Sequence, residues 1–172
     1  DQNFFLTSYK TDFLNFTKGL GGSGSSYIDI FDNNLYLVTA NGIITTTNIN
    51  SFNNKKFEMN IVKNNLKEIL NQRLMFKDFA YGIKDILISS NKIYLSFTDE
   101  IKKDCFNLSI LEADILQKKI EFNYFFKPDT CIKRDAEDLF SLHHAGGRLI
   151  NFDNDNIVFS IGEFRSRGLA QD

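Results

Sequence analysis

Apolar and polar residues alternate with a period of two along most of this chain. Three stretches join two alternating runs through a short polar turn, which is the pattern of a β-hairpin. These stretches are Tyr27–Thr39, Asp85–Thr98 and Arg148–Gly162. Their turns are rich in Asn, Asp and Ser, which tolerate the positive φ angles of tight hairpins. The turns are Asp32–Asn34, Ser89–Lys92 and Asp153–Asn156.

The hairpins recur at long intervals. Their second strands align on Tyr36, Tyr94 and Val158, which gives spacings of 58 and 64 residues. Such intervals are long for a solenoid repeat and are typical of a β-propeller blade with an elaborated outer edge. We therefore predict an all-β chain of about three antiparallel blades. Their expected positions are near residues 27–60, 85–126 and 147–163.

The segments between the hairpins predict further elements. Phe57–Arg73 has apolar positions that fit a short helix or an amphipathic outer segment. Asn107–Asp114 and Lys119–Phe126 alternate, and we expect them to be the outer strands of the second blade. The Phe-rich N-terminus predicts an incoming strand pair. Residues 19–26 form a Gly/Ser loop, which we interpret as a turn, because a nucleotide-binding loop would be followed by a helix.

Length and charge exclude several classes of protein. The chain has 172 residues and a formal net charge of −2, without the basic stripe of a nucleic-acid binder. No apolar run approaches the roughly 18 residues of a membrane span. The chain begins at Asp1, without methionine, and ends at Asp172 directly after a strand-like segment. We expect it to be a processed or truncated piece of a larger domain.

Two cysteines, Cys105 and Cys131, bracket the two expected outer strands. If those strands pair in antiparallel fashion, both residues fall near the open end of the pair, where a disulfide can form. Two unpaired buried thiols are the alternative, and a metal or redox role is a third interpretation. A disulfide would indicate an oxidising compartment.

Both histidines, His143 and His144, precede Gly146 and Gly147. Glycines remove side-chain bulk beside an imidazole and allow a close approach of the backbone. Because a histidine can accept a proton near neutral pH, this arrangement suits an exposed general base. A loop histidine bonded to a neighbouring blade is the alternative interpretation.

The C-terminal part carries a more specific pattern. It comprises the sequence H-A-G-G-R-L at His144–Leu149, a hairpin with Asp153–Asp155, F-S-I-G-E at Phe159–Glu163 and A-Q-D at Ala170–Asp172. The pattern resembles the glucose/sorbosone dehydrogenase family over Leu142–Asp172. Members of that family are six-bladed β-propellers with four-stranded antiparallel blades. The resemblance therefore implies that this chain is the N-terminal portion, about three blades, of such a propeller.

The resemblance also implies a chemistry. Family members oxidise aldose sugars or related alcohols with pyrroloquinoline quinone and calcium, and His144 matches their general base. Glu163 matches the acidic residue that orients this base, although the family usually has Asp there. Most of the residues that ligate calcium and hold the quinone would lie beyond Asp172, in the remaining blades. The implied location is periplasmic or secreted, and we expect the segment alone to be inactive.

Arginines are the remaining candidates for contact with an anionic cofactor. Arg148 could face the quinone, or it could pair with an acid of the loop that holds Asp135, Glu137 and Asp138. We expect Arg165 and Arg167 to be solvated loop residues. The competing hypothesis for the whole protein is a non-catalytic propeller that binds a glycan or a protein.

Overall fold

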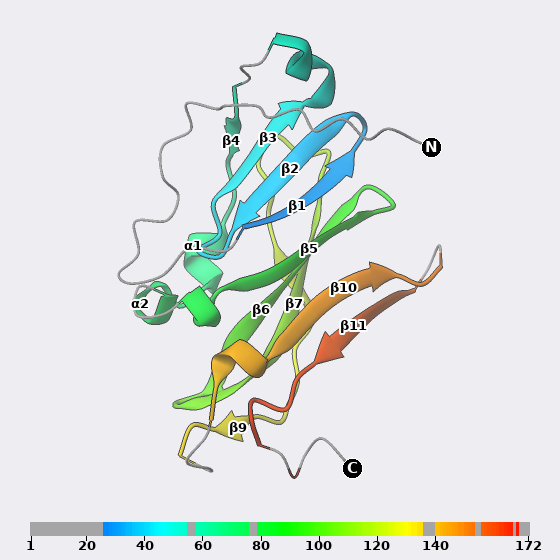
Figure 1. Ribbon diagram of the computed structural model, residues 1–172. Coiled ribbons are helices and arrows are strands. Elements are labelled where there is room, and N and C mark those ends of the chain that lie inside the picture. The colour runs from blue at the N-terminus through cyan, green and yellow to red at the C-terminus, as the bar shows by residue number, and fades with distance from the viewer. Residues whose placement is uncertain are drawn as a thin grey trace, which may run out of the picture.

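The computed structural model describes residues 26–54, 58–75, 79–135, 140–153 and 156–166, together with Gly168. Three antiparallel sheets follow one another along the chain (Figure 1). The expected N-terminal strand pair and nearly all of the Gly/Ser loop lie outside the described residues. The prediction of a mostly β chain with antiparallel sheets is confirmed.

The first sheet is a meander of four strands in sequence order. Its strands are β1 (Ser26–Phe31), β2 (Asn34–Thr39), β3 (Ile44–Asn48) and β4 (Asn60–Val62). Asp32 and Asn33 form the β1–β2 turn with φ angles of 46° and 57°, so the predicted Asx turn is present. A 3₁₀-helix, η1 (Ile49–Asn54), begins the connection from β3 to β4.

The segment expected to be one helix or one amphipathic piece is divided in the structure. Ile61 belongs to strand β4, where it pairs with Thr45 and is 68% exposed. The side-chain oxygen of Asn64 then accepts a hydrogen bond from the backbone N–H of Leu66 at 3.0 Å, which starts a helical turn. Two short helices follow, α1 (Leu66–Ile69) and α2 (Gln72–Met75), and then the 3₁₀-helix η2 (Phe79–Tyr81).

The second sheet is longer and holds the expected outer strands. It consists of β5 (Ile83–Ser89), β6 (Lys92–Lys102), β7 (Cys105–Asp114) and β8 (Asn123–Phe126). A short strand, β9 (Ile132–Lys133), pairs with the start of β7. The β5–β6 turn uses Ser90 and Asn91 at φ angles of 50° and 64°, as the hairpin pattern predicted.

The third sheet is the hairpin of β10 (Gly146–Asn151) and β11 (Ile157–Ile161). A 3₁₀-helix, η3 (Leu142–His144), lies directly before it. The predicted third hairpin is therefore confirmed, and its first strand starts two residues after His144.

The first strands of the three sheets lie next to one another, with β5 in contact with both β1 and β10 (Figure 1). Two aspartate side chains accept hydrogen bonds from the neighbouring sheets. Asp29 on β1 accepts a hydrogen bond from the backbone N–H of Ile88 at 2.6 Å, and Asp85 on β5 accepts one from Leu149 at 2.9 Å. Each bond crosses from one sheet to the next, which fixes the sheets against each other.

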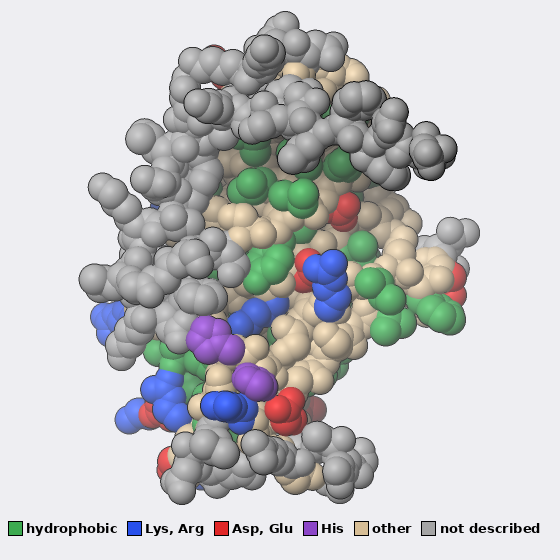
Figure 2. Space-filling model, viewed as in Figure 1, with side chains coloured by type: hydrophobic (Ala, Val, Ile, Leu, Met, Phe, Trp, Pro, Cys, Tyr) green, Lys and Arg blue, Asp and Glu red, His purple; other side chains and the backbone are tan. Residues whose placement is uncertain are grey.

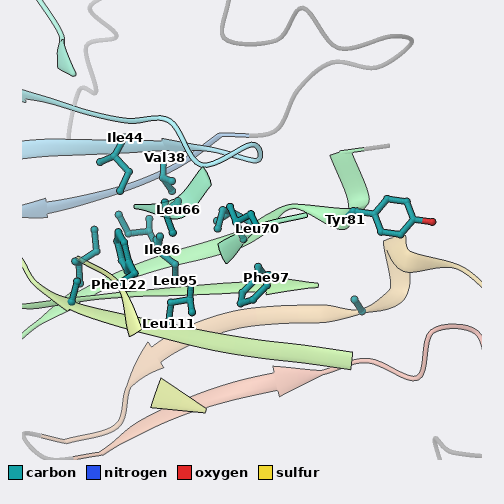
Figure 3. Close-up of a cluster of buried hydrophobic side chains, with 14 of the residues drawn as sticks. Val38, Ile44, Leu66, Leu70, Tyr81, Ile86, Leu95, Phe97, Leu111 and Phe122 are labelled. Atoms are coloured by element: carbon teal, nitrogen blue, oxygen red, sulfur yellow. The ribbon is translucent and has the colours of Figure 1, made fainter. Parts of the chain in front are cut away.

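Most of the apolar core lies between the first and second sheets. Figure 3 shows Val38 and Ile44 facing Leu66, Ile86 and further apolar side chains across this layer. Strand β7 of the second sheet is buried on both faces, because its successive residues 108–111 are all 0% exposed and neighbours on a strand point to opposite faces. Each fully buried Leu or Ile contributes about 1.5–3 kcal/mol.

Candidate functional site

The two histidines lie in the turn that enters strand β10. In helix η3 the Leu142 side chain is buried, and the following Ala145 is 0% exposed, so both anchor the turn in the core. His143 and His144 are exposed, and the histidine side chains (purple) are visible on the face in Figure 2. The segment therefore presents imidazoles to solvent on a buried support, as an accessible base requires.

Strand β10 approaches β5 at a glycine. Gly147 has a φ angle of +113°, and a Cβ atom there would lie 2.4 Å from the Cβ of Lys84. A side chain at this position would therefore collide with the middle sheet. The expected close approach of the backbone after the histidines is present, and its partner is strand β5.

The chain leaving β11 returns to the histidine turn and binds it through the backbone. Gly162 donates to the carbonyl of Ala145 at 2.8 Å, and Phe164 donates to the carbonyl of His144 at 3.3 Å. A Cβ atom on Gly162 would lie 1.8 Å from the His144 carbonyl oxygen. Glycine at this position therefore allows the two segments to touch and brings the next residue, Glu163, beside His144.

Phe164 anchors this return segment. It is 0% exposed and stacks on Phe140 with a centroid distance of 5.8 Å. Phe164 and Arg165 have φ angles of 53° and 67°, which are uncommon for residues with side chains. Such a conformation persists where the surroundings hold it in place. Here the buried ring and the backbone bonds hold it, and Glu163 keeps its place next to the histidine turn.

His144 and Glu163 form the pair that the resemblance implied. The Nδ1 atom of His144 lies 3.5 Å from Oε1 of Glu163, and the side chains are 46% and 30% exposed. The backbone N–H of Glu163 lowers the pKa of its carboxyl below the usual value, partial burial opposes this, and the charge of His144 adds to it. A carboxylate beside Nδ1 favours the tautomer whose Nε2 is free to accept a proton.

Arg148 pairs with a partner that the sequence did not suggest. Its Nε atom lies 3.6 Å from Oδ2 of Asp85, while Arg148 itself is 77% exposed. Among the described residues the ion pair of Arg148 is with Asp85 on β5 and not with Asp135, one of the loop acids that the sequence offered. Glu137 and Asp138 lie outside the described residues. The signal that could have revealed Asp85 is an acidic residue directly before the apolar run Ile86–Ile88 of β5.

The cysteines form a disulfide. Cys105 and Cys131 are bonded, with their Cα atoms 5.4 Å apart, so the alternatives of free thiols and of a cysteine metal site are wrong. The bond ties the start of β7 to the segment before β9. Arg165 is exposed, as predicted, and Arg167 lies outside the described residues.

An open cleft of about 640 Å³ borders Glu163 on the side of the disulfide. One wall is the end of β11 with Gly162 and Glu163, and the other is the segment around Cys131. The lining residues are Asn107, Thr130, Cys131, Ile132, Ile161, Gly162 and Glu163. Glu163 therefore both lines the cleft and contacts His144.

The described residues fit an anionic cofactor only in part. Arg148 is an exposed cation on β10 and is compatible with a carboxylate of a quinone. No group of three or more His, Cys, Asp or Glu side chains that could hold a metal ion occurs in the described part of the chain. The described residues therefore hold no cluster of carboxylates for calcium. Within the same ranges, no helix is long and apolar enough to cross a membrane.

No family model matches the chain, and no curated protein matches it significantly. Solved structures do match. One, described as "glucose dehydrogenase", aligns with a TM-score of 0.57 and 14% identity over 84% of this chain and 42% of its own. A second, "Crystal structure of glucose dehydrogenase", aligns with a TM-score of 0.57 and 15% identity over 84% of this chain and 39% of its own. The chain thus spans about two fifths of each structure, and the likeness concerns the fold.

Proposed function

We propose that this chain supplies three consecutive blades of a six-bladed β-propeller that oxidises an aldose or a related alcohol with pyrroloquinoline quinone. His144 is the general base in this proposal, and Glu163 is the positioning residue beside it. The single observation that carries the proposal is the His144–Glu163 pair at the entrance of the first strand of a sheet.

The arrangement of the sheets supports the propeller. Each of the first two sheets is a meander, and the first strands β1, β5 and β10 are neighbours, as the inner strands of adjacent blades are. The likeness to two glucose dehydrogenase structures supports the same architecture. Because this chain covers about two fifths of those structures, we propose that residues outside it complete the ring.

The geometry of the pair suits the removal of a hydroxyl proton. With Nδ1 directed at Glu163, the Nε2 atom of His144 accepts the proton of the sugar hydroxyl that is oxidised. Glu163 stays ionised because its pKa is lowered, and it stabilises the imidazolium that results. The quinone, when bound, supplies the acceptor for the hydride that leaves the same sugar carbon. Arg148 is a candidate for holding a cofactor carboxylate.

The disulfide supports an oxidising location. Such bonds persist in secreted and periplasmic proteins and are rare in the cytosol. The bond between Cys105 and Cys131 is therefore in keeping with a periplasmic or secreted enzyme.

Reconstitution tests the proposal. The full-length protein is mixed with pyrroloquinoline quinone and calcium, and reduction of a dye is followed over a panel of aldoses. We expect quinone-dependent turnover with at least one aldose, and no turnover from the 172-residue segment alone. If the full-length protein binds no quinone, the dehydrogenase proposal fails, and the competing hypothesis of a glycan- or protein-binding propeller replaces it.

The role of Glu163 has its own test. In Glu163→Gln the carboxylate beside Nδ1 is lost, and we expect kcat to fall with little change in KM, because the imidazole is no longer held in the tautomer that leaves Nε2 free. Glu163→Asp keeps the charge but moves it away from Nδ1 by one methylene, so it should restore part of the lost kcat. An unchanged kcat in Glu163→Gln would contradict a positioning role.

A further inference from the structure

Strand β5 sends a lysine to the histidine turn, and the proton transfer described above does not use it. The Nζ atom of Lys84 donates a hydrogen bond to the backbone carbonyl of Leu142 at 3.2 Å. Leu142 is the first residue of helix η3, which carries both histidines, whereas Lys84 belongs to the first strand of the middle sheet. The bond therefore joins the exposed turn to the neighbouring sheet (Figure 1).

The aliphatic part of Lys84 is packed where β5 meets strand β10. A Cβ atom on Gly147 would lie 2.4 Å from Cβ and 2.9 Å from Cγ of Lys84, so the backbone of Gly147 lies directly against this side chain. Lys84 is accordingly only partly exposed. This packing limits the rotamers of the lysine and directs its ammonium group along β10 towards Leu142.

A β-bulge in β5 gives Lys84 its direction. In the pairing of β5 with β6, Ile83 lies opposite Phe97 and Asp85 lies opposite Ser96, so Lys84 is the extra residue of the bulge. Successive side chains of a regular strand point to opposite faces, and a bulge redirects one of them. The bulge thus allows two neighbouring side chains, Lys84 and Asp85, to reach the same segment of the chain.

Asp85 binds that segment after the histidines, and Lys84 binds it before them. The buried carboxylate of Asp85 accepts a hydrogen bond from the backbone N–H of Leu149 at 2.9 Å. Lys84 holds the carbonyl of Leu142 seven positions earlier in the chain. Two adjacent residues of β5 therefore fix both ends of the stretch that contains His144.

Helix η3 depends on contacts from outside, because its own hydrogen bonds are long. The backbone N–H of His144 lies 3.2 Å from the carbonyl of Ser141, and that of Ala145 lies 3.3 Å from the carbonyl of Leu142. These distances are at or beyond the upper end of the usual range of roughly 2.7–3.2 Å. A single turn with such bonds does not by itself fix the direction of an imidazole.

We propose that Lys84 is a positioning residue for His144. Its ammonium group holds helix η3 in the orientation in which His144 meets Glu163. The proposal rests on the function proposed above, since it assigns Lys84 to the base of that reaction. In this role Lys84 acts through the backbone of Leu142 and exchanges no proton with the substrate.

Removal of the ammonium group tests this role in the full-length protein with quinone, calcium and an accepted aldose. Lys84→Met keeps an unbranched side chain against Gly147 and loses the donor, so we expect kcat to fall about tenfold and KM to change by less than about twofold. Lys84→Arg restores a donor and should recover most of the lost kcat. An unchanged kcat in Lys84→Met would overturn the proposal.

Lys92→Met is the matched control. Lys92 lies on β6 of the same sheet, and its exposed Nζ atom is 2.7 Å from the carboxylate of Glu112. The control also replaces a bonded lysine by methionine, and it should change neither kinetic constant. Thermal unfolding of every variant checks that it folds. A loss of kcat in Lys92→Met equal to that in Lys84→Met would overturn a specific role for Lys84.

A double variant distinguishes a positioning lysine from one that only stabilises the fold. If Lys84 acts by holding His144 against Glu163, its loss matters little once that carboxylate is gone. In the background of Glu163→Gln, we therefore expect Lys84→Met to lower kcat by less than about threefold. Losses that multiply independently in the double variant would overturn the proposal.

Nuclear magnetic resonance separates this proposal from the dehydrogenase function. In the quinone-free full-length protein with isotope-labelled histidine, the nitrogen chemical shifts of His144, assigned with His144→Gln, give the share of neutral imidazole protonated at Nδ1. We expect this tautomer to dominate in the wild type and in Lys92→Met, and to lose its excess in Lys84→Met. That result would support the positioning role even if no aldose is oxidised. Turnover by the wild type, with equal tautomer shares in all three proteins, would overturn the role of Lys84 and leave the dehydrogenase function standing.

Discussion

The middle sheet, β5–β8, and the hairpin β10–β11 differ in how they are held. The middle sheet has a central strand, β7, that is buried on both faces, and the disulfide ties the start of β7 to Cys131. The hairpin leaves Ile150 and Val158, which are cross-strand partners, 52% and 46% exposed. It nevertheless carries the residues that flank the candidate site. The middle sheet thus supplies the buried support, and the neighbouring hairpin carries the residues beside the candidate site.

The division shows why the site can be exposed and still ordered. His144 and Glu163 are held by backbone bonds and by buried neighbours, Ala145 and Phe164, and not by burial of their own side chains. An accessible base and a rigid support are then compatible. Substitutions in the middle sheet should therefore act on stability, and substitutions at the turn should act on the contact between His144 and Glu163.

The largest effect on stability is expected from the middle sheet. Leu111 is 0% exposed on β7, and Leu111→Ala should lower the free energy of unfolding by about 3 kcal/mol, from lost burial and the cavity left behind. Ile150→Ala on the exposed face of β10 should cost less than about 1 kcal/mol. Urea unfolding of both variants measures the contrast. Equal losses would show that the hairpin is as deeply packed as the sheet.

The disulfide is expected to contribute nearly as much. The bond joins residues 26 positions apart, and the double variant Cys105→Ser with Cys131→Ser should be less stable by about 3 kcal/mol, because the unfolded chain gains freedom. Unfolding of the wild-type chain with and without reductant gives an independent value. A double variant as stable as the wild type would contradict a stabilising role of the disulfide.

A smaller loss of stability, with a larger effect on the site, is expected at Gly162. Gly162→Ala forces a Cβ atom against the His144 carbonyl, which is backbone and has little room to move, so we expect a loss of about 1–3 kcal/mol. The His144–Glu163 contact should open as a result. Gly168→Ala is the control, because nothing lies within 4 Å of a Cβ atom there. Similar behaviour of the two variants would argue against the close approach.

The smallest effect concerns Tyr124 on β8. Burial, and then the nearby Asp99 carboxylate, raise the pKa of Tyr124 to about 12. Since this pKa is raised on folding, the stability it contributes is present below about pH 10 and is lost as the pH rises towards 12. Ultraviolet titration of the wild type minus Tyr124→Phe isolates this phenol. Asp99→Asn should lower its midpoint, and an ordinary midpoint in the wild type would refute the packing around β8.

The sequence predicted the three hairpins well because alternation and Asx turns are local signals. The turn residues Asp32, Asn33, Ser90 and Asn91 all adopt the positive φ angles that their side chains tolerate. The outer strands and the pairing of Cys105 with Cys131 were also predictable, since the cysteines bracket two alternating runs. The segment after β3 was not, because Ile61 is paired into a strand by β3, which no local pattern reports.

The residues of the candidate site could be predicted from the sequence, but the contacts that bring them together could not. The resemblance pointed to His144 and Glu163, yet the reason they meet is the missing side chain of Gly162 and the buried ring of Phe164. Asp85, which lies 64 residues from Leu149, was missed because its hydrogen bond to that residue depends on how two sheets stack. Contacts between residues that are far apart along the chain do not produce a periodic pattern of apolar and polar residues.

The central claim, that the exposed turn before β10 holds the base, is tested most directly by two adjacent substitutions in the full-length protein. His144→Ala and His143→Ala are compared by kcat/KM with quinone, calcium and an accepted aldose. We predict a loss of at least about 100-fold for His144→Ala, as expected when a general base is removed, and less than about fivefold for His143→Ala. Undiminished turnover in His144→Ala would contradict the claim.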